Sequence, residues 1–278
     1  MQVDTYKRHK GASYELSFDF YFFTTLSIMK TAVILAVAGS VLGRTFTVYN
    51  ACPFTIWPAI FTDLNVGTSV PSIENGWEAP AYSKRSFTVP DDWRAGRIWG
   101  RTQCDFSTNP GINSCLTGGC NGGLVCDNKT GVGLPPATFA EFTLGANAQD
   151  YTDVSLVDGF NLPMRISNTG GCKVAECTVN LNTDCPQPLK GPVDANGTVA
   201  ACKSACLAQI SPPSNSPSCC TGDFQTPATC PPSGVEYYSY FKQRCPYSYV
   251  YAYDESSGTS LLTCPSSKKA DYTVTFCP

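Results

Sequence analysis

Histidine is almost missing from this sequence. The 278 residues include one, His9, which lies ahead of the expected start of the mature protein. A mature chain without histidine cannot build a Ser-His-Asp or Cys-His arrangement for nucleophilic catalysis. Zinc sites usually combine clustered cysteines with histidine, so the cysteines of "CKSAC" and "CKVAEC" are poor candidates for metal ligands. We therefore expect neither a metal nor another cofactor.

Charge and phosphate-binding motifs are also scarce. Charged residues make up 15% of the chain, and no glycine-rich phosphate loop precedes a helix. Residues 1–43 carry four of the 19 Lys and Arg and three of the 22 Asp and Glu, so the remainder has a formal charge of −4. Such a mildly acidic domain is a poor partner for nucleic acid. Any catalysis must rest on carboxylates, or on Tyr, Lys or Arg.

The N-terminal region predicts secretion. Met29 and Lys30, followed by "TAVILAVAGSVLG", form a signal peptide with expected cleavage after Gly43, and residues 1–28 are interpreted as an upstream extension. The alternative is a signal anchor, because residues 16–42 are largely apolar. Asp19 and Lys30 interrupt that run, which argues against a span of about 20 residues. We expect a secreted monomer, extracellular or in the cell wall, with no integral membrane span in its mature form.

The cysteines predict a covalent framework. All sixteen lie between Cys52 and Cys277, inside the expected mature region. An even number of cysteines in a secreted chain favours disulfides, here eight. A bond between the first and last cysteine would tie the two ends of this region together and stabilise it by about 5 kcal/mol in the chain-entropy model.

Short strand patterns recur along the mature region and predict a mainly β fold, either a sandwich or a barrel. Two Cys-rich stretches interrupt these patterns, and "TVAACKSACLAQI" in the second stretch carries the one helical periodicity. The expected strands include "RTFTVYN", "TFAEFTLG", "YTDVSLVDGF", "YSYVYAYD" and "DYTVTFCP". The expected organisation is a β core at 44–101, 137–178 and 246–278, a small disulfide loop lobe at 102–136, and a helical disulfide-rich lobe at 179–245.

These segments, in this order, resemble the thaumatin-like proteins, the family of thaumatin, osmotin and zeamatin. The likeness spans essentially the whole mature region. It is carried by "GRIWGRTQC", "PPATFAEFTL", "QDYTDVSLVDGFNLPM", "CKSAC", "SCC", "CPYSYVYAYD" and "YTVTFCP". The resemblance implies a lectin-like β-sandwich with two small disulfide-rich lobes, one containing a short helix, and a cleft between the sandwich and the helical lobe.

The resemblance also implies a disulfide pairing that the cysteine count alone leaves open. The implied pairs are Cys52–Cys277, Cys104–Cys115, Cys120–Cys126, Cys172–Cys264, Cys177–Cys245, Cys185–Cys202, Cys206–Cys219 and Cys220–Cys230. Five of these close short loops, as two core-poor insertions require.

Many antifungal members of this family line the cleft with one arginine and four carboxylates. Motif by motif, the matching residues are Glu141 in "AEF", Asp153 in "YTDVS", Asp158 in "VDGF" and the arginine of "GRIWGR", for which Arg97 is preferred over Arg101. The fifth position, usually an aspartate after "CP", is Tyr247 here. This departure would make the cleft less acidic.

Strand geometry limits how these carboxylates can meet. Asp153 and Asp158 would lie on opposite faces of a continuous strand, so both reach one cleft only if the strand ends, bends or bulges between them, which Gly159 permits. Asp150 is expected in a turn before the strand. The alternative interpretation of the acidic residues is a solvated surface without a ligand.

The resemblance implies binding and hydrolysis of β-1,3-glucan. Hydrolysis needs an acid and a second carboxylate. We assign Glu141 as the acid, with a pKa raised by neighbouring carboxylates and by burial against Phe142. The partner carboxylate is Asp158, with Asp153 in reserve, and the expected substrate contacts are Arg97, Tyr247 and Phe142. A non-catalytic, glucan-binding antifungal protein is the alternative. A sweet-taste role is disfavoured because taste thaumatins are strongly basic and this chain is acidic.

Two further patterns concern the surface. Residues 247, 249, 251 and 253 are all tyrosines, so one strand face would carry four rings, for packing or for stacking on sugars. "NKT" at Asn128 and "NGT" at Asn196 match the N-glycosylation pattern in surface-type stretches.

Overall fold

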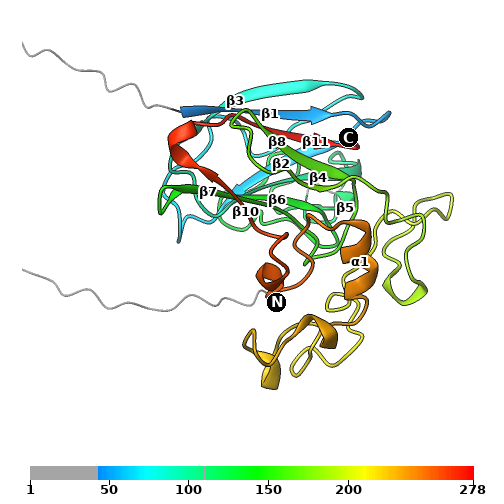
Figure 1. The fold of residues 1–278 in the computed structure, drawn as a ribbon. Helices are drawn as coiled ribbons and strands as arrows, with labels where there is room; N and C mark the ends of the chain where they lie inside the picture. The colour runs from blue at the N-terminus through cyan, green and yellow to red at the C-terminus, as the bar shows by residue number, and fades with distance from the viewer. Residues whose placement is uncertain (1–42, 109–110) are drawn as a thin grey trace, which may run out of the picture. The chain divides into compact units, whose positions relative to one another are not determined.

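The computed structural model describes residues 43–108 and 111–278, and these form two β-sheets with loop-rich extensions (Figure 1). The expected signal peptide and upstream extension lie outside the described residues. The five-stranded sheet has the order β3 (Lys84–Pro90), β1 (Gly43–Asn50), β11 (Tyr272–Phe276), β8 (Met164–Asn168) and β9 (Ala175–Cys177). The six-stranded sheet has the order β10 (Leu262–Pro265), β7 (Gln149–Ser155), β6 (Phe139–Ala146), β4 (Gly96–Cys104) and β2 (Trp57–Thr62), with β5 (Cys115–Thr117) paired to β4.

The two sheets pack face to face, which confirms the mainly β sandwich. Alternate side chains along each strand point into the space between them, as in Tyr272, Val274 and Phe276 of β11. Phe46 of β1 meets Phe142 of β6 edge-on across this space, with ring centroids 4.9 Å apart. Trp93 stacks on the other side of Phe142 at 5.6 Å. The apolar alternation of the sequence therefore defines the interior of the sandwich.

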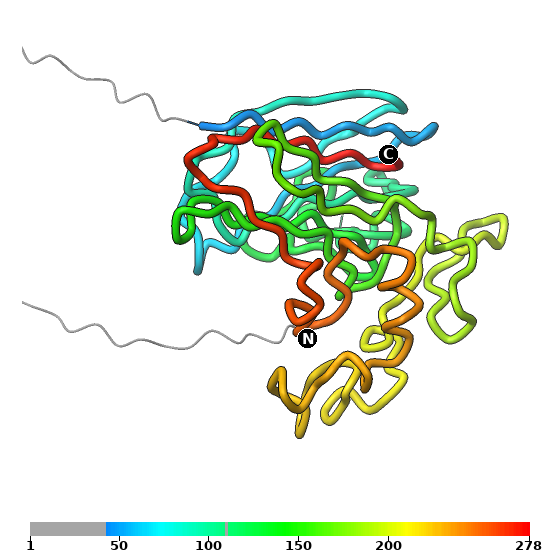
Figure 2. The backbone as a smooth tube through the Cα atoms, viewed as in Figure 1, coloured from blue at the N-terminus to red at the C-terminus, as the bar shows by residue number. Residues whose placement is uncertain are grey.

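The first and last strands of the described region are joined in one sheet and by a disulfide. β1 and β11, the first and last described strands, are parallel neighbours, and Cys52–Cys277 joins the loops that follow them. Figure 2 shows the red C-terminal strand running beside the blue strand β1.

Eight disulfides bond all sixteen cysteines, in the eight pairs that the resemblance implies. A second, smaller apolar cluster lies on the outer face of the six-stranded sheet. There Trp99 and Phe139 pack with Cys120, Cys126 and the partly buried Val132 from the loop region between β5 and β6. The disulfide thus supplies part of the apolar contact for a segment that has little core of its own.

The helix is not where the sequence periodicity predicts it. The α-helix of the described residues is α1 (Tyr238–Arg244), whereas residues 198–210 form bridges and irregular turns. Cys202 is held extended by bridges to Phe160 and Lys190, and it is bonded to Cys185. These long-range contacts override the local helical pattern. Short 3₁₀ turns occur at Gln187–Leu189, Gly222–Phe224, Pro232–Gly234, Asp254–Ser257 and Ser266–Lys268.

The segment "YSYVYAYD" is not the strand that its alternation predicts. Tyr247 and Tyr249 each form an isolated β-bridge, and the chain then turns. The tyrosines consequently differ in exposure, from 42% for Tyr247 to 3% for Tyr251. Tyr251 packs edge-on against Tyr238 of α1, with ring centroids 5.6 Å apart. No helix in the described part of the chain has the length and apolarity needed to cross a bilayer.

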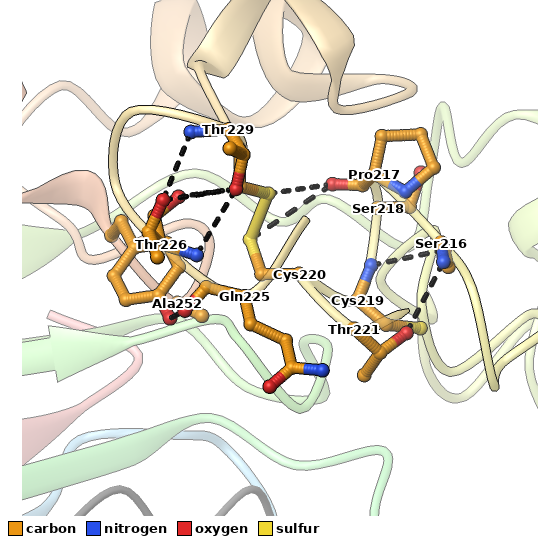
Figure 3. The surroundings of a disulfide bond; sticks show 12 residues. Ser216, Pro217, Ser218, Cys219, Cys220, Thr221, Gln225, Thr226, Thr229 and Ala252 are labelled. Atoms are coloured by element: carbon orange, nitrogen blue, oxygen red, sulfur yellow. Dashed lines mark hydrogen bonds between the residues drawn. A yellow bond between two sulfur atoms is a disulfide. The ribbon is translucent and has the colours of Figure 1, made fainter. Parts of the chain in front are cut away.

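Hydrogen bonds reinforce the lobe that contains α1. Figure 3 shows the Cys220–Cys230 bond, where Thr226 and Thr229 bond to each other beside the sulfur atoms. On the other side, the backbone N–H of Cys219 donates to the Ser216 hydroxyl at 3.1 Å. Short polar contacts of this kind hold a region in which little apolar surface is available.

Candidate functional site

Three of the expected site residues form one row across the six-stranded sheet. Arg97 of β4 lies opposite Glu141 of β6, and Glu141 lies opposite Asp153 of β7. Directly opposed residues have Cβ atoms about 4.5–5.5 Å apart and share one face. Their neighbours along the strands point into the sandwich, so the row lies on the outer face. We call Arg97, Glu141 and Asp153 the acidic row.

The hairpin between β6 and β7 sets this alignment. Asn147 and Ala148, at its tip, both have left-handed backbone with φ of 51° and 60°. This is the backbone of the two-residue turn that matches strand twist in hairpins. The pairing register of β6 with β7 shifts at a bulge between Thr143 and Ala146. With this shift, Glu141 lies directly opposite Asp153.

Arg97 is the cation of the row. Its Nη2 lies 3.1 Å from Oε1 of Glu141, and its guanidinium stacks 4.8 Å from the centroid of Phe139. Arg101 has a structural role, because it is fully buried and donates hydrogen bonds to the backbone carbonyls of Trp57 and Gly123. The geometry favours Arg97 over Arg101 as the arginine of the site.

Asp153 is the most protected carboxyl of the row. The residue is 8% exposed, and its Oδ1 atom has no hydrogen-bond partner within the described residues. Burial and the neighbouring charge of Glu141 raise the pKa of Asp153 well above its ordinary value, against the opposing effect of Arg97. Asp153 therefore holds a proton more readily than an ordinary aspartate.

Glu141 is more accessible, with 34% of its side chain exposed. Surrounding protein nevertheless raises the pKa of Glu141; the ion pair with Arg97 opposes this effect and the charge of Asp158 adds to it. Glu141 thus combines an elevated proton affinity with access to solvent.

Asp158 lies three residues beyond the end of β7, outside the acidic row itself. That strand ends at Ser155, and the chain turns at Gly159, where φ is 91°. The strand end between Asp153 and Asp158 is the condition that strand geometry sets for both to face one site. Burial raises the pKa of Asp158, and Arg97 acts in the opposite direction, so the two groups lie within electrostatic reach.

Two further residues lie near the row, and only one of them was singled out from the sequence. Tyr249, named there among the four alternating tyrosines, forms a bridge to Ser155 of β7, and burial and the carboxylate of Glu255 raise the pKa of its phenol. The charge of Glu255 also raises the pKa of Asp153. Glu255 was not singled out, and its only sequence signal was the acidic pair at the end of "YAYDE", next to the tyrosines.

The structure does not place Phe142 in the site. Its ring is 2% exposed and packs between Phe46 and Trp93, on the inner face of β6. Successive strand residues point to opposite faces, so Phe142 cannot line the same surface as Glu141. The assignment of Phe142 as a substrate contact, and as the apolar group that buries Glu141, was wrong.

Tyr247 lies on the rim of the molecule, and its role stays a prediction. Its backbone pairs with Glu176 of β9, in the other sheet. Within residues 43–108 and 111–278, its side chain makes no hydrogen bond or ring contact with the acidic row. The side chain is free to contact a ligand, but the described contacts do not tie it to Glu141.

Asp150 corrects another expectation. It lies inside β7 rather than in a preceding turn, and it is fully buried on the inner face. Its carboxylate accepts hydrogen bonds from Arg44, Ser266, Tyr272 and the backbone of Gly145. Asp150 is therefore a structural carboxylate, separate from the acidic row.

Both expected glycosylation acceptors are exposed. Asn128 accepts a hydrogen bond from Nδ2 of Asn75 at 2.5 Å. Asn196 lies at the tip of a turn in which Asp194 caps its backbone N–H at 2.9 Å. Glycan attachment at either residue stays a prediction.

Comparison with known proteins agrees with this fold and these motifs. The chain is 44% identical over 254 residues to "Thaumatin-like protein 1a" of Malus domestica, which covers 89% of this chain and 95% of that protein. It is 44% identical over 236 residues to "Pathogenesis-related thaumatin-like protein 3.5" of Cryptomeria japonica, covering 84% and 89% of the two chains.

A structural likeness is more distant. A laminaripentaose-producing β-1,3-glucanase from Paenibacillus barengoltzii superposes with a TM-score of 0.48 at 13% identity, covering 91% of this chain and 81% of that one, which is too low to bear on activity. The model of the thaumatin family, in contrast, matches residues 50–278, which include every residue of the acidic row. The chain belongs to the thaumatin family.

Proposed function

We propose that this thaumatin-family protein is secreted, binds β-1,3-glucan of cell walls at the acidic row, and hydrolyses it. The observation that carries this proposal is the alignment of Arg97, Glu141 and Asp153 on one outer sheet face, with Asp158 within electrostatic reach. Carboxyl groups whose proton affinities are raised together are typical of sites that perform acid–base chemistry. β-1,3-Glucan is the polymer that the resemblance to thaumatin-like proteins implies.

Hydrolysis of a glycosidic bond requires a protonated acid at the leaving oxygen and a second carboxylate as base or nucleophile. Glu141 fits the acid because it is accessible and its pKa is raised. Asp158 is the partner carboxylate. Asp153 is too protected to approach a polysaccharide, so in this proposal it acts through Glu141 as a positioning residue: two neighbouring carboxyls resist losing both protons.

Arg97 has two roles in the proposal. It holds Glu141 in place through the ion pair and compensates part of the negative charge of the site. Its guanidinium is itself fixed over Phe139, so the pair is oriented before a ligand arrives.

The test is Glu141→Gln, measured by release of reducing sugar from a linear β-1,3-glucan. The amide cannot donate a proton, so we expect hydrolysis to fall by about 10²- to 10⁴-fold. Binding to insoluble β-1,3-glucan should largely survive. The matched control is Glu74→Gln, because Glu74 is also an accessible, arginine-paired glutamate but belongs to the region around β3. Equal hydrolysis by wild type and Glu141→Gln would remove Glu141 from the mechanism.

A non-catalytic antifungal role is the second candidate. It is favoured by the ion pair with Arg97, which stabilises the ionised form of Glu141, and by Tyr247 at the position where many relatives carry a carboxylate. In that case the wild-type protein should sediment with insoluble β-1,3-glucan and inhibit fungal growth without releasing reducing sugar.

A further inference from the structure

A cavity of 650 Å³ lies at the end of the sandwich where Cys52 and Cys277 are joined. Its walls come from the turn before β2, the end of β4, the segment before β8 and the lobe residues 180–200. None of Arg97, Glu141, Asp153 or Asp158 lines it. A concave, mostly apolar space of this size is typical of small-molecule sites.

Several uncharged polar groups in the cavity have no hydrogen-bond partner among the described residues. The hydroxyls of Thr55 and Thr198 and the amide of Gln103 make no side-chain hydrogen bond within residues 43–108 and 111–278. The indole N–H of Trp57 also has no hydrogen-bond partner in the described part of the chain, whereas Trp93 and Trp99 donate to Thr62 and Gly118 at 2.7 Å. These groups are available to a ligand that offers several hydroxyls.

The backbone adds an independent observation. Gln103 has a φ of 49° although it lies inside β4, and Cys277, across the cavity, has a φ of 53°. Left-handed backbone at a residue other than glycine is costly, and it persists where the surrounding structure requires the side chain in that place. Here the left-handed residue Gln103 is one of the residues that line the cavity.

The lining also selects among ligand classes. Asp194 is the one charged residue in the lining, and no lysine or arginine accompanies it, so an anion would be repelled. A purely apolar ligand would leave the hydroxyls, the amide and the indole N–H without partners. A pyranose ring matches both requirements, because it has an apolar face for Trp57 or Phe54 and a rim of hydroxyls for the polar groups.

We infer that this cavity is a second carbohydrate site, which takes a neutral mono- or disaccharide independently of the acidic row. Trp57 and the exposed Phe54 supply the stacking surfaces, and Thr55, Gln103 and Thr198 supply the hydrogen bonds. The site does not depend on hydrolysis, so it can exist in an active enzyme or in a pure binding protein.

The decisive variant is Gln103→Gly. Glycine adopts the left-handed backbone without strain, so the melting temperature should stay unchanged or rise. Loss of the amide should weaken laminaribiose and cellobiose binding, measured by calorimetry and saturation-transfer NMR, by about tenfold. Thr55→Val should weaken binding to a similar extent, while Glu141→Gln should leave it unchanged.

Three results would overturn the inference. The first is absence of binding by either disaccharide up to about 10 mM, a concentration that detects even weak sugar sites. The second is binding of sodium octanoate in place of the sugars, which would make the cavity a site for apolar anions. The third is disaccharide binding that is unchanged in both Gln103→Gly and Thr55→Val, which would place the bound sugar outside this cavity. Failure of hydrolysis in the wild type would contradict the proposed catalysis and leave this inference standing.

Discussion

Strand β7 carries two buried aspartates with opposite behaviour. Asp150 points into the sandwich and Asp153 points outward, three residues along the same strand. Burial opposes ionisation of Asp150, but hydrogen bonds led by those from Arg44 and Ser266 prevail and lower its pKa. Asp153 has a free Oδ1 and acidic neighbours, and its pKa is raised. Burial is common to both residues, so the supply of hydrogen-bond donors decides which carboxyl has a lowered pKa and which has a raised pKa.

The largest effect on the difference between the two aspartates is expected from replacing Asp150. In Asp150→Asn the buried guanidinium of Arg44 loses its closest carboxylate and keeps only Asp91, whose Oδ1 is 2.9 Å from Nε. We expect a loss of about 3 kcal/mol in the free energy of unfolding at pH 7, the lower end for a broken buried pair. Urea denaturation followed by tryptophan fluorescence measures it. Ser266→Ala, which removes one neutral donor to Asp150, should cost only about 1 kcal/mol.

The pH dependence sharpens the same prediction. The folded pKa of Asp150 lies below its unfolded value, so its contribution is fully present above the unfolded pKa of about 3.9 and disappears as the pH falls through the folded pKa. The stability difference between wild type and Asp150→Asn should therefore shrink in strongly acidic solution. A difference that stays constant down to that range would mean that Asp150 acts through shape rather than charge.

Asp153→Asn should have a smaller effect on stability, and of opposite sign. Because the folded pKa of Asp153 is raised, the wild type loses stability as the pH rises from the unfolded pKa towards the folded pKa. The amide has no such loss, so the variant should gain relative to wild type over that range, by about 1 kcal/mol or less at pH 7. In the proposed mechanism it also lowers the pKa of Glu141, which moves the alkaline limb of hydrolysis to lower pH. An unchanged alkaline limb would show that Asp153 does not influence the pKa of Glu141.

Tyr247→Asp should have the smallest effect. It restores the carboxylate that many thaumatin-like proteins carry, but at a position that is 42% exposed. An exposed charge contributes up to about 1 kcal/mol, so glucan binding should weaken by no more than about fivefold. Any shift of the pH–activity profile should be upward, since an added negative charge raises neighbouring pKa values. No change in either measurement would place Tyr247 outside the working surface.

The sequence was informative where local pattern and long-range structure agree. Period-two alternation predicted the sandwich strands, and the motifs around Glu141 and Asp153 predicted two members of one row, which the hairpin brings into register. Alternation also predicted that Asp153 and Asp158 could share a cleft only if the strand ended, bent or bulged between them, and β7 ends at Ser155. In these segments, the face on which each side chain lies follows mainly from its place in the strand.

The wrong predictions concern segments whose structure is determined by contacts distant in the sequence. The predicted helix around Cys202 does not form, because bridges and a disulfide hold Cys202 extended. The strand predicted from the alternating tyrosines does not form either, because the chain turns beside α1. Phe142 was assigned to the site because it is adjacent to Glu141, although adjacency along a strand means opposite faces. Asp150 could not be predicted as structural because its partners Arg44 and Tyr272 lie 106 and 122 residues away in the sequence.

The parallel pairing of β1 with β11 has a consequence for biosynthesis. β11 lies between β1 and β8 in its sheet, yet it follows every other strand in the chain. During vectorial synthesis, β1 therefore waits with an unfilled edge until the last strand has emerged, while β6 and β7 can already form their hairpin. The centre of this sheet is therefore filled only after β1 and β8 have both been made, so each of these strands keeps one unpaired edge until β11 is available.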